Sequence, residues 1–177
     1  MVKYGIISDT HTENLNKKEI NAFLKEIEHI FQDIDLIIHA GDIGSEKIIE
    51  KLKQIAPVKQ VAGECDMGKN SKEFLFFSTK EFPNPIGIIH KLPEDLEKFC
   101  DESKLTGGIL IYGHTHKPVI KGTRFNVLLL NPGSPTVPEA PDQIPGFNKP
   151  VARPSVMKLI IEDEVVRTFI INLKYKI

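Results

Sequence analysis

The sequence predicts an α/β fold, and three observations favour it. Between residues 2 and 62, apolar runs of strand length alternate with helix-spaced apolar residues, and the connections between them are short. This alternation is the pattern of a parallel α/β sheet. Acidic or imidazole residues stand directly after the apolar runs, and parallel sheets gather their ligands outside the carboxyl ends of the strands.

Three apolar runs predict buried strands in this first part of the chain, at residues 2–8, 36–39 and 58–62. Apolar residues recur at 3.6-residue spacing from Ile20 to Phe31, which predicts a helix, and Asn16 with Glu19 forms a capping pair at its start. Ser45 is the predicted cap of a shorter helix. That helix turns three apolar residues inward, Ile48, Ile49 and Leu52.

The second part of the chain predicts another sheet. Six segments are strand-like, at residues 74–77, 86–89, 109–112, 125–130, 156–161 and 165–173. One helix, from about Pro93 to Lys104, interrupts them, and residues 161–165 join the last two as a hairpin. We expect this second sheet to be largely antiparallel. Seven of the twelve prolines lie between Pro132 and Pro154, so we expect an extended loop there rather than a domain linker.

Length and composition limit the classes of protein. A chain of 177 residues buries about 70% of its unfolded surface, which favours a single domain over residues 1–177. With 23 basic and 24 acidic residues and no basic stripe, long nucleic acid is not an expected partner. No apolar run approaches the ~18 residues of a membrane span, and the first residues lack a signal peptide pattern. Two cysteines fit a reducing compartment, so we expect a cytoplasmic protein without a membrane partner.

Five short segments carry the chemistry of the chain. They are Asp9-Thr-His11, Gly41-Asp42, Gly63-Glu64-Cys65-Asp66, Ile89-His90 and Gly113-His114-Thr-His116. Alternate residues of an extended chain point the same way, so the two ends of an Asp-x-His segment can reach one ion. Taken singly, such a segment is more often turn chemistry, and paired histidines are more often solvated. All five in this order, each near the end of an apolar strand, favour a shared metal site.

In this order the segments resemble the metallophosphoesterase (calcineurin-like) superfamily, specifically its small single-domain archaeal and bacterial phosphodiesterase branch. The resemblance covers nearly the whole chain. It implies a four-layer αββα sandwich, with two mixed β-sheets flanked by helices. It also implies two ion sites, one made by Asp9, His11, Asp42 and His116 and the other by Asp42, Glu64, His90 and His114.

The resemblance implies a metal-dependent phosphodiesterase, a hydrolase whose substrate is a small phosphodiester. Asp42 would bridge two divalent ions roughly 4 Å apart, and a hydroxide between the ions would attack phosphorus in line with the leaving group. Asp42 and His114 then act in catalysis through the bridging hydroxide and the phosphate site. Mixed imidazole and carboxylate ligands suit manganese, iron, nickel or zinc better than calcium or magnesium, and they do not choose among these four. Manganese is our first choice, with nickel, iron or zinc as alternatives.

Three residues depart from the family pattern. Glu64 stands where the family usually has Asn. Two divalent ions, two Asp carboxylates and a hydroxide give the usual site a net charge of about +1, and an ionised Glu64 as a further ligand would bring it near zero. Alternatively, Glu64 is a solvated loop carboxylate that binds no ion. Cys65 stands where larger members have a histidine that assists the leaving group, so good leaving groups are expected to react faster. Lys91 follows His90 where Gly is usual, and it either restores positive charge or is simply solvated.

A second hypothesis comes from a different class of protein. The chain could be a catalytically weak or inactive protein-interaction scaffold with a metallophosphoesterase fold, like the retromer subunit of eukaryotes. Glu64 and Lys91 are its best support. A homodimer stays open beside a monomer. Outside the ligand set, Asp66 is expected to brace loops, His39 to lie in the core and His29 on the surface.

Overall fold

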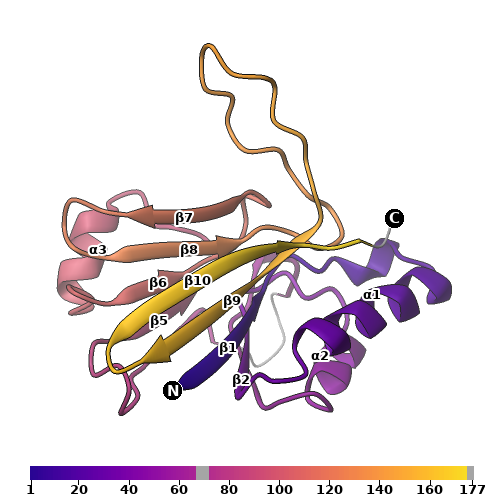
Figure 1. Ribbon diagram of the computed structural model, residues 1–177, viewed down its shortest axis with the longest axis horizontal. Coiled ribbons are helices and arrows are strands. Elements are labelled where there is room, and N and C mark those ends of the chain that lie inside the picture. Colours follow the sequence, from indigo (N-terminus) through magenta and orange to yellow (C-terminus); the bar gives the residue numbers. More distant parts are fainter. Residues whose placement is uncertain (67–71, 175–177) are drawn as a thin grey trace.

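The computed structural model describes residues 1–66 and 72–174, and it forms a four-layer αββα sandwich (Figure 1). This confirms the predicted fold class. In chain order the elements are β1 (Val2–Ile7), α1 (Lys17–Ile30), β2 (Leu36–His39), α2 (Glu46–Leu52), β3 (Val58–Gln60), β4 (Phe74–Phe77), β5 (Ile86–Ile89), α3 (Leu96–Glu102), β6 (Ile109–Ile111), β7 (Pro118–Gly122), β8 (Leu128–Pro132), β9 (Ser155–Glu162) and β10 (Val165–Asn172). A short 3-10 turn at Glu64–Asp66 contains the predicted ligand Glu64, and another at Thr12–Asn14 directly follows His11.

Two sheets of five strands pack face to face. The first has the order β10-β9-β1-β2-β3, and the second has the order β4-β5-β6-β8-β7. In the first sheet β1 pairs in parallel with β2, and β2 with β3, so the carboxyl ends of these three strands lie at one edge. In the second sheet β5, β6 and β8 are parallel neighbours. Both sheets therefore deliver strand ends to loops on one side of the sandwich.

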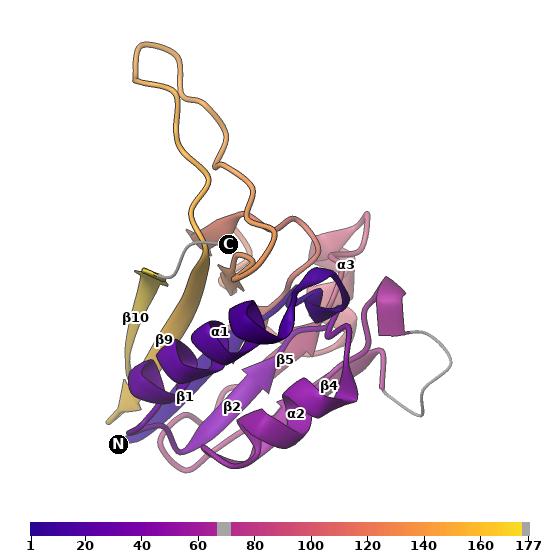
Figure 2. The same ribbon diagram turned by 90° about the vertical axis from the view of Figure 1, so that its right-hand side faces the viewer.

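Three apolar clusters hold the four layers together. One lies between the sheets and joins residues such as Ile6 and Ile38 to Ile88 and Ile111. The second packs α1 and α2 onto the first sheet, and the third packs α3 onto the second sheet. Figure 2 shows α1 and α2 on the outer face of the first sheet. The central strands are thus buried on both faces, which is why they are continuous apolar runs, whereas the edge strands β7 and β10 are partly exposed.

The helix starts follow their capping chemistry. At α1 the Asn16 side chain accepts from the backbone N–H groups of Lys18 and Glu19, and the Glu19 side chain accepts from the Asn16 N–H, as expected. Ser45 precedes α2, but its side chain makes no capping hydrogen bond, so that part of the prediction is wrong. The third helix is shorter than predicted because Asp95 caps it, accepting from Lys98 N at 3.0 Å.

Two sheet predictions and one strand boundary are wrong. The second sheet is mixed and not largely antiparallel, because two of its four strand pairings are parallel. The hairpin of β9 and β10 does not belong to it: β9 pairs antiparallel with β1 in the first sheet. The strand expected at 125–130 begins only at Leu128, because Thr123 forms a turn by hydrogen bonds with Val127.

The proline-rich segment projects from the sandwich as an extended arm, defined here as residues 135–154 (Figure 1). Residues 141–149 are all exposed, among them Ile144 at 63% and Phe147 at 72%. This is the extended loop that the proline pattern predicts. Among the described residues, no helix is long and apolar enough to cross a bilayer.

Candidate metal centre

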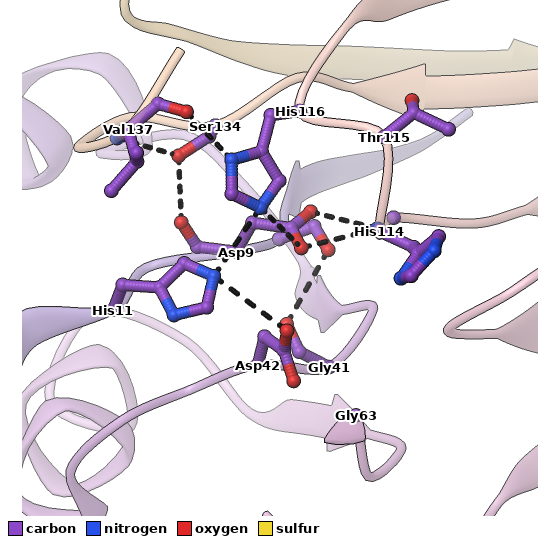
Figure 3. Close-up of polar contacts among 12 residues, drawn as sticks. Asp9, His11, Gly41, Asp42, Gly63, His114, Thr115, His116, Ser134 and Val137 are labelled. Atoms are coloured by element: carbon purple, nitrogen blue, oxygen red, sulfur yellow. Dashed lines mark hydrogen bonds and ion pairs between the residues drawn. The ribbon is translucent and has the colours of Figure 1, made fainter. Parts of the chain in front are cut away.

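All seven residues proposed as metal ligands meet at the edge where strands of both sheets end. Asp9 and His11 follow β1, Asp42 follows β2, and Glu64 follows β3. His90 follows β5, while His114 and His116 follow β6. Figure 3 shows Asp9, His11, Asp42 and His116 turned toward one another. Their possible ligand atoms fall into overlapping clusters, within each of which all atoms lie within 4.8 Å of one another.

The backbone of these residues is strained. Nine non-glycine residues of the described chain have a positive φ, and five of them are expected ligands: Asp9, His11, Asp42, His114 and His116. A left-handed backbone costs an L-residue about 1–2 kcal/mol, so it persists where the surrounding structure enforces it. Such strain gathers at functional sites. The positive φ angles at these ligands indicate a functional site, and they could not be predicted from the sequence.

The first half-site consists of Asp9, His11 and His116. His11 Nε2 and His116 Nε2 lie 3.3 Å apart, and His116 Nε2 lies 3.4 Å from Asp9 Oδ1. His116 Nδ1 donates to the Val137 carbonyl at 2.7 Å, which leaves the Nε2 lone pair facing the other ligand atoms. The Asp9 side chain is fully buried, so this half-site is shielded from solvent.

The second half-site consists of Glu64, His90 and His114. Glu64 Oε2 lies 2.9 Å from His90 Nε2 and 3.2 Å from His114 Nδ1. The side chains of Glu64 and His114 are 46% and 38% exposed, whereas that of His90 is only 4% exposed. This half-site therefore opens to solvent on the Glu64 side.

Asp42 lies between the two half-sites. Its Oδ2 is 3.6 Å from His11 Nε2 and 3.3 Å from His90 Nε2. Its Oδ1 accepts a hydrogen bond from the Cys65 backbone N–H at 2.9 Å, which orients the carboxylate. One oxygen of Asp42 thus faces histidines of both half-sites, which is the position of a bridging ligand.

Glycines allow the backbone to pack closely against the side chains of the metal site. A Cβ at Gly63 would overlap the Asp42 carboxylate, and one at Gly113 would overlap the Ser8 hydroxyl. A Cβ at Gly41 would come within 2.6 Å of His90 Nδ1, and Gly41 also has a φ of 92°. The glycines that precede the acidic and histidine residues of the motifs are therefore required by packing around the ligands.

Charges in the site are strongly coupled. Burial opposes the ionisation of Asp42, but His90 and the Cys65 N–H outweigh it and hold the pKa of that carboxyl well below its usual range. Burial likewise opposes protonation of His90, but Asp42, the Ala40 carbonyl and Asp9 outweigh it and raise the pKa to about 9. Without ions, a protonated His90 therefore offsets part of the negative charge of Asp42 and Asp9.

The donor set fits divalent ions. His90 Nδ1 donates to the Ala40 carbonyl at 2.7 Å, which leaves Nε2 as the free donor atom. That Nε2 is buried and has no hydrogen-bond partner among the described residues, although Glu64 Oε2 lies 2.9 Å from it. A buried nitrogen without a partner is costly, and a metal ion satisfies it. Mixed imidazole and carboxylate ligands suit first-row divalent ions.

Cys65 is an additional candidate ligand. Burial and the negative charge of Asp42 raise the pKa of its thiol to about 11 in the ion-free protein. Its Sγ lies 3.9 Å from His11 Nδ1 and forms a cluster with possible ligand atoms of His11 and Asp42. A bound cation lowers the pKa of a coordinating thiol, so the raised pKa of the ion-free site does not exclude Cys65 from ligation.

Several residues brace the site. Asp66 accepts from the backbone N–H groups of Ile43 and Gly63, which is the loop-bracing role expected for it. His39 is fully buried and its Nε2 contacts Thr10 Oγ1 at 3.0 Å, which confirms the core position predicted for it. Burial lowers the His39 pKa to about 4, so it stays neutral.

Sequence reasoning missed the role of residues 131–136. Asn131 Nδ2 donates to the Gly113 carbonyl at 2.9 Å. Ser134 Oγ donates to the Asp9 carbonyl at 2.7 Å (Figure 3). Thr136 Oγ1 donates to the Thr10 carbonyl at 2.9 Å. These fully or nearly fully buried side chains hold the ligand loops together. Glycine and proline in the segment explain a turn but do not reveal these hydrogen bonds.

Known proteins resemble this chain over most of its length. A family model, the calcineurin-like phosphoesterase superfamily domain, matches residues 2–147. A probable metallophosphoesterase of Methanocaldococcus jannaschii is 35% identical over 167 residues, covering 91% of this chain and 77% of that protein. A probable metallophosphoesterase of Methanothermobacter thermautotrophicus is 34% identical over 177 residues, covering 95% and 91%.

Solved structures share the fold at lower identity. A predicted phosphoesterase of Streptococcus pneumoniae superposes with a TM-score of 0.72 at 18% identity, covering 97% of this chain and 89% of that one. Vps29 of Entamoeba histolytica, crystallised with zinc, superposes with a TM-score of 0.70 at 22% identity, covering 97% and 99%. The fold, the site and these matches define the class of metallophosphoesterases. The chain belongs to the calcineurin-like phosphoesterase superfamily, whose members use divalent metal ions.

Proposed function

We propose that this chain is a metal-dependent phosphodiesterase that hydrolyses small phosphodiesters with two divalent ions, manganese being our first choice. The observation that carries the proposal is the position of Asp42. Its Oδ2 faces His11 of one half-site at 3.6 Å and His90 of the other at 3.3 Å. Ions held there supply Lewis acidity to a phosphate ester and lower the pKa of an attacking water. We place this activity in the cytoplasm.

The residues of the site have separate roles in binding the ions and the substrate. Asp9, His11 and His116 would hold one ion in the buried half-site, and His90, His114 and Glu64 would hold the other in the exposed half-site. Asp42 would contribute to the binding of both ions. Because Glu64 and His114 face solvent, the substrate phosphate approaches from their side. The hydrogen bonds of Asn131 and Ser134 keep the ligand loops in place before ions bind.

The charge of the site favours a diester over a monoester. Two divalent ions, the carboxylates of Asp9, Asp42 and Glu64 and one hydroxide would leave a net charge near zero. A site without a large positive charge gains little from the second negative charge of a phosphomonoester, so it suits the singly charged phosphodiester better. The Cys65 thiol, whose pKa burial and Asp42 raise in the ion-free protein, is a weak proton donor to a leaving alkoxide. An aryl diester should therefore be cleaved faster than an alkyl diester.

The test is hydrolysis of bis-p-nitrophenyl phosphate by protein reconstituted with manganese, nickel, iron or zinc. Ions per chain are counted in parallel by elemental analysis, and we expect two. Asp42→Asn should remove turnover and at least one ion. Asp101→Asn, the same change at an exposed position of α3, is the matched control and should change neither. Full turnover in the Asp42→Asn protein would overturn the assignment.

A weak or inactive scaffold is the second candidate function, and Glu64 favours it. Its carboxylate already contacts both imidazoles of the exposed half-site, so it can occupy their ligand nitrogens in place of an ion. In that case the parent protein does not hydrolyse the diester with any of the four metal ions, and Glu64→Asn increases both ion binding and turnover. An active parent that loses activity on this substitution supports the phosphodiesterase.

A further inference from the structure

A lysine lies beside the exposed half-site. Lys91 directly follows His90, and its Nζ lies 3.7 Å from Glu64 Oε1. The other oxygen of the same carboxylate, Oε2, faces His90 Nε2 at 2.9 Å and His114 Nδ1 at 3.2 Å. Glu64 therefore stands between the imidazoles of the half-site and an ammonium group.

The ammonium lies on the solvent side of this arrangement. The side chain of Lys91 is 62% exposed, whereas His90 on the opposite side of Glu64 is 4% exposed. Exposed ion pairs contribute little to folding stability, so the Lys91–Glu64 contact adds little to the stability of the fold. The exposed ammonium is open to an anion that approaches the half-site from solvent.

Lys117 differs from Lys91 in its ion-pair partner. It too directly follows a histidine of the site, His116, but its Nζ lies 2.7 Å from Asp142 Oδ1 on the arm. Asp142 is 89% exposed and belongs to no half-site. The charge of Lys117 is thus paired with the arm, while the charge of Lys91 is paired with the metal site itself.

We propose that Lys91 is the residue that recognises the anionic phosphate of the substrate, with Glu64 holding its ammonium next to the exposed half-site. This inference rests on the proposed function, because it assigns how that same site attracts its substrate. It also gives Glu64 two tasks, since one oxygen faces the imidazoles and the other faces the lysine.

Opposite charges make the inference testable. Removing a cation beside the site should weaken the binding of an anion, and it should leave the binding of metal cations unchanged or slightly tighter. A lysine that only oriented Glu64 would support metal binding, so its removal would weaken metal binding. A merely solvated lysine would change neither.

The experiment titrates manganese and then inorganic phosphate into the protein by calorimetry, which needs no turnover. For Lys91→Gln we expect about fivefold weaker phosphate binding, and manganese binding that is unchanged or up to about threefold tighter. Lys91→Arg keeps the charge and should restore phosphate binding to within about twofold. Lys117→Gln is the matched control and should leave both titrations unchanged.

Two results would overturn the inference: weaker manganese binding in Lys91→Gln, or phosphate binding equal to that of the parent. In the diesterase assay the same variant should raise KM and leave kcat unchanged. If the parent binds phosphate through Lys91 but does not hydrolyse the diester in any metal, the proposed function fails and the assignment of Lys91 stands.

Discussion

His11 has φ and ψ values of 33° and 44°, a left-handed conformation that costs L-residues about 1–2 kcal/mol. Glycine adopts this region without that cost. In protein without metal ions we therefore expect His11→Gly to be more stable than His11→Ala by about 1 kcal/mol, measured by urea unfolding. Both variants lose the same imidazole, so their difference isolates the backbone.

His29 is the matched control for this prediction. It lies exposed in the last turn of α1, where glycine should be less stable than alanine by about 1 kcal/mol. The order of the two substitutions is thus expected to reverse between the two histidines. The same order at both positions would show that the His11 backbone is not strained.

The raised pKa of His90 predicts how stability depends on pH. In ion-free protein its pKa is about 9, against an ordinary value of 6.5. The folded state binds the proton more tightly, so this contribution is complete below pH 6.5 and is lost as pH rises through 9. It amounts to at most about 3 kcal/mol. Urea unfolding in a chelator should therefore show declining stability across this range, and His90→Gln should flatten the decline.

Metal ions should reverse this trend. A histidine that ligates an ion must be neutral, so ions and protons compete for His90. The affinity for manganese should increase as pH rises from 6.5 to 9, with proton release detected by calorimetry in buffers of different ionisation enthalpy. An affinity independent of pH would exclude His90 from the ligands.

Residue types in the motifs predicted which side chains meet, but not how they are held. Asp9, His11, Asp42 and His116 come together as the order of the motifs suggested. Asn131 and Ser134 lie far from them in sequence, and their roles depend on hydrogen bonds to the backbone of Gly113 and Asp9. Backbone carbonyls leave no trace in a sequence, so such bracing residues could not be identified from it.

At the scale of elements, the N-terminal caps of α1 and α2 test how much a capping hydrogen bond stabilises the fold. Asn16 accepts two backbone hydrogen bonds at the start of α1, so Asn16→Ala should lower the free energy of unfolding by about 1 kcal/mol. Ser45 is the N-cap residue of α2, but its side chain makes no capping hydrogen bond. Ser45→Ala should therefore change the free energy of unfolding by less than about 0.5 kcal/mol. Equal losses in urea unfolding would contradict this distinction.

Strand positions were more predictable than strand partners. The apolar runs of β1, β2, β4 and β5 gave their positions to within a residue. The run at β9 is equally apolar, and nothing in it indicates which of the two sheets it joins. The edge strand β7 was missed because it is short, half-exposed and begins with proline, so it lacks an apolar pattern.

At the scale of the whole molecule, the arm is the part that packing does not stabilise. Its root is held by Ser134 and Thr136, which bond to the backbone near Asp9, whereas residues 141–149 are exposed throughout. The proline pattern predicted an extended loop. It could not predict the direction of the arm, which is set by where β8 ends and β9 begins in different sheets.

The exposed arm predicts a specific site of limited proteolysis. Chymotrypsin should cut after Phe147, which is 72% exposed on irregular backbone, before any other described phenylalanine or tyrosine. Phe74 and Phe169 are also exposed, but their strands β4 and β10 protect the backbone. Trypsin should spare the arm, because Lys149 and Arg153 both precede proline.

Mass spectrometry should find fragments 1–147 and 148–177 after the chymotrypsin cut. The two fragments should elute together under native conditions, because β9 remains paired with β1 of the other fragment. Phe147→Ser should remove the cut and leave the unfolding temperature unchanged, since this side chain packs on none of the three apolar clusters. First cleavage within β4 or β10 would show that the sheet edges open more readily than the arm.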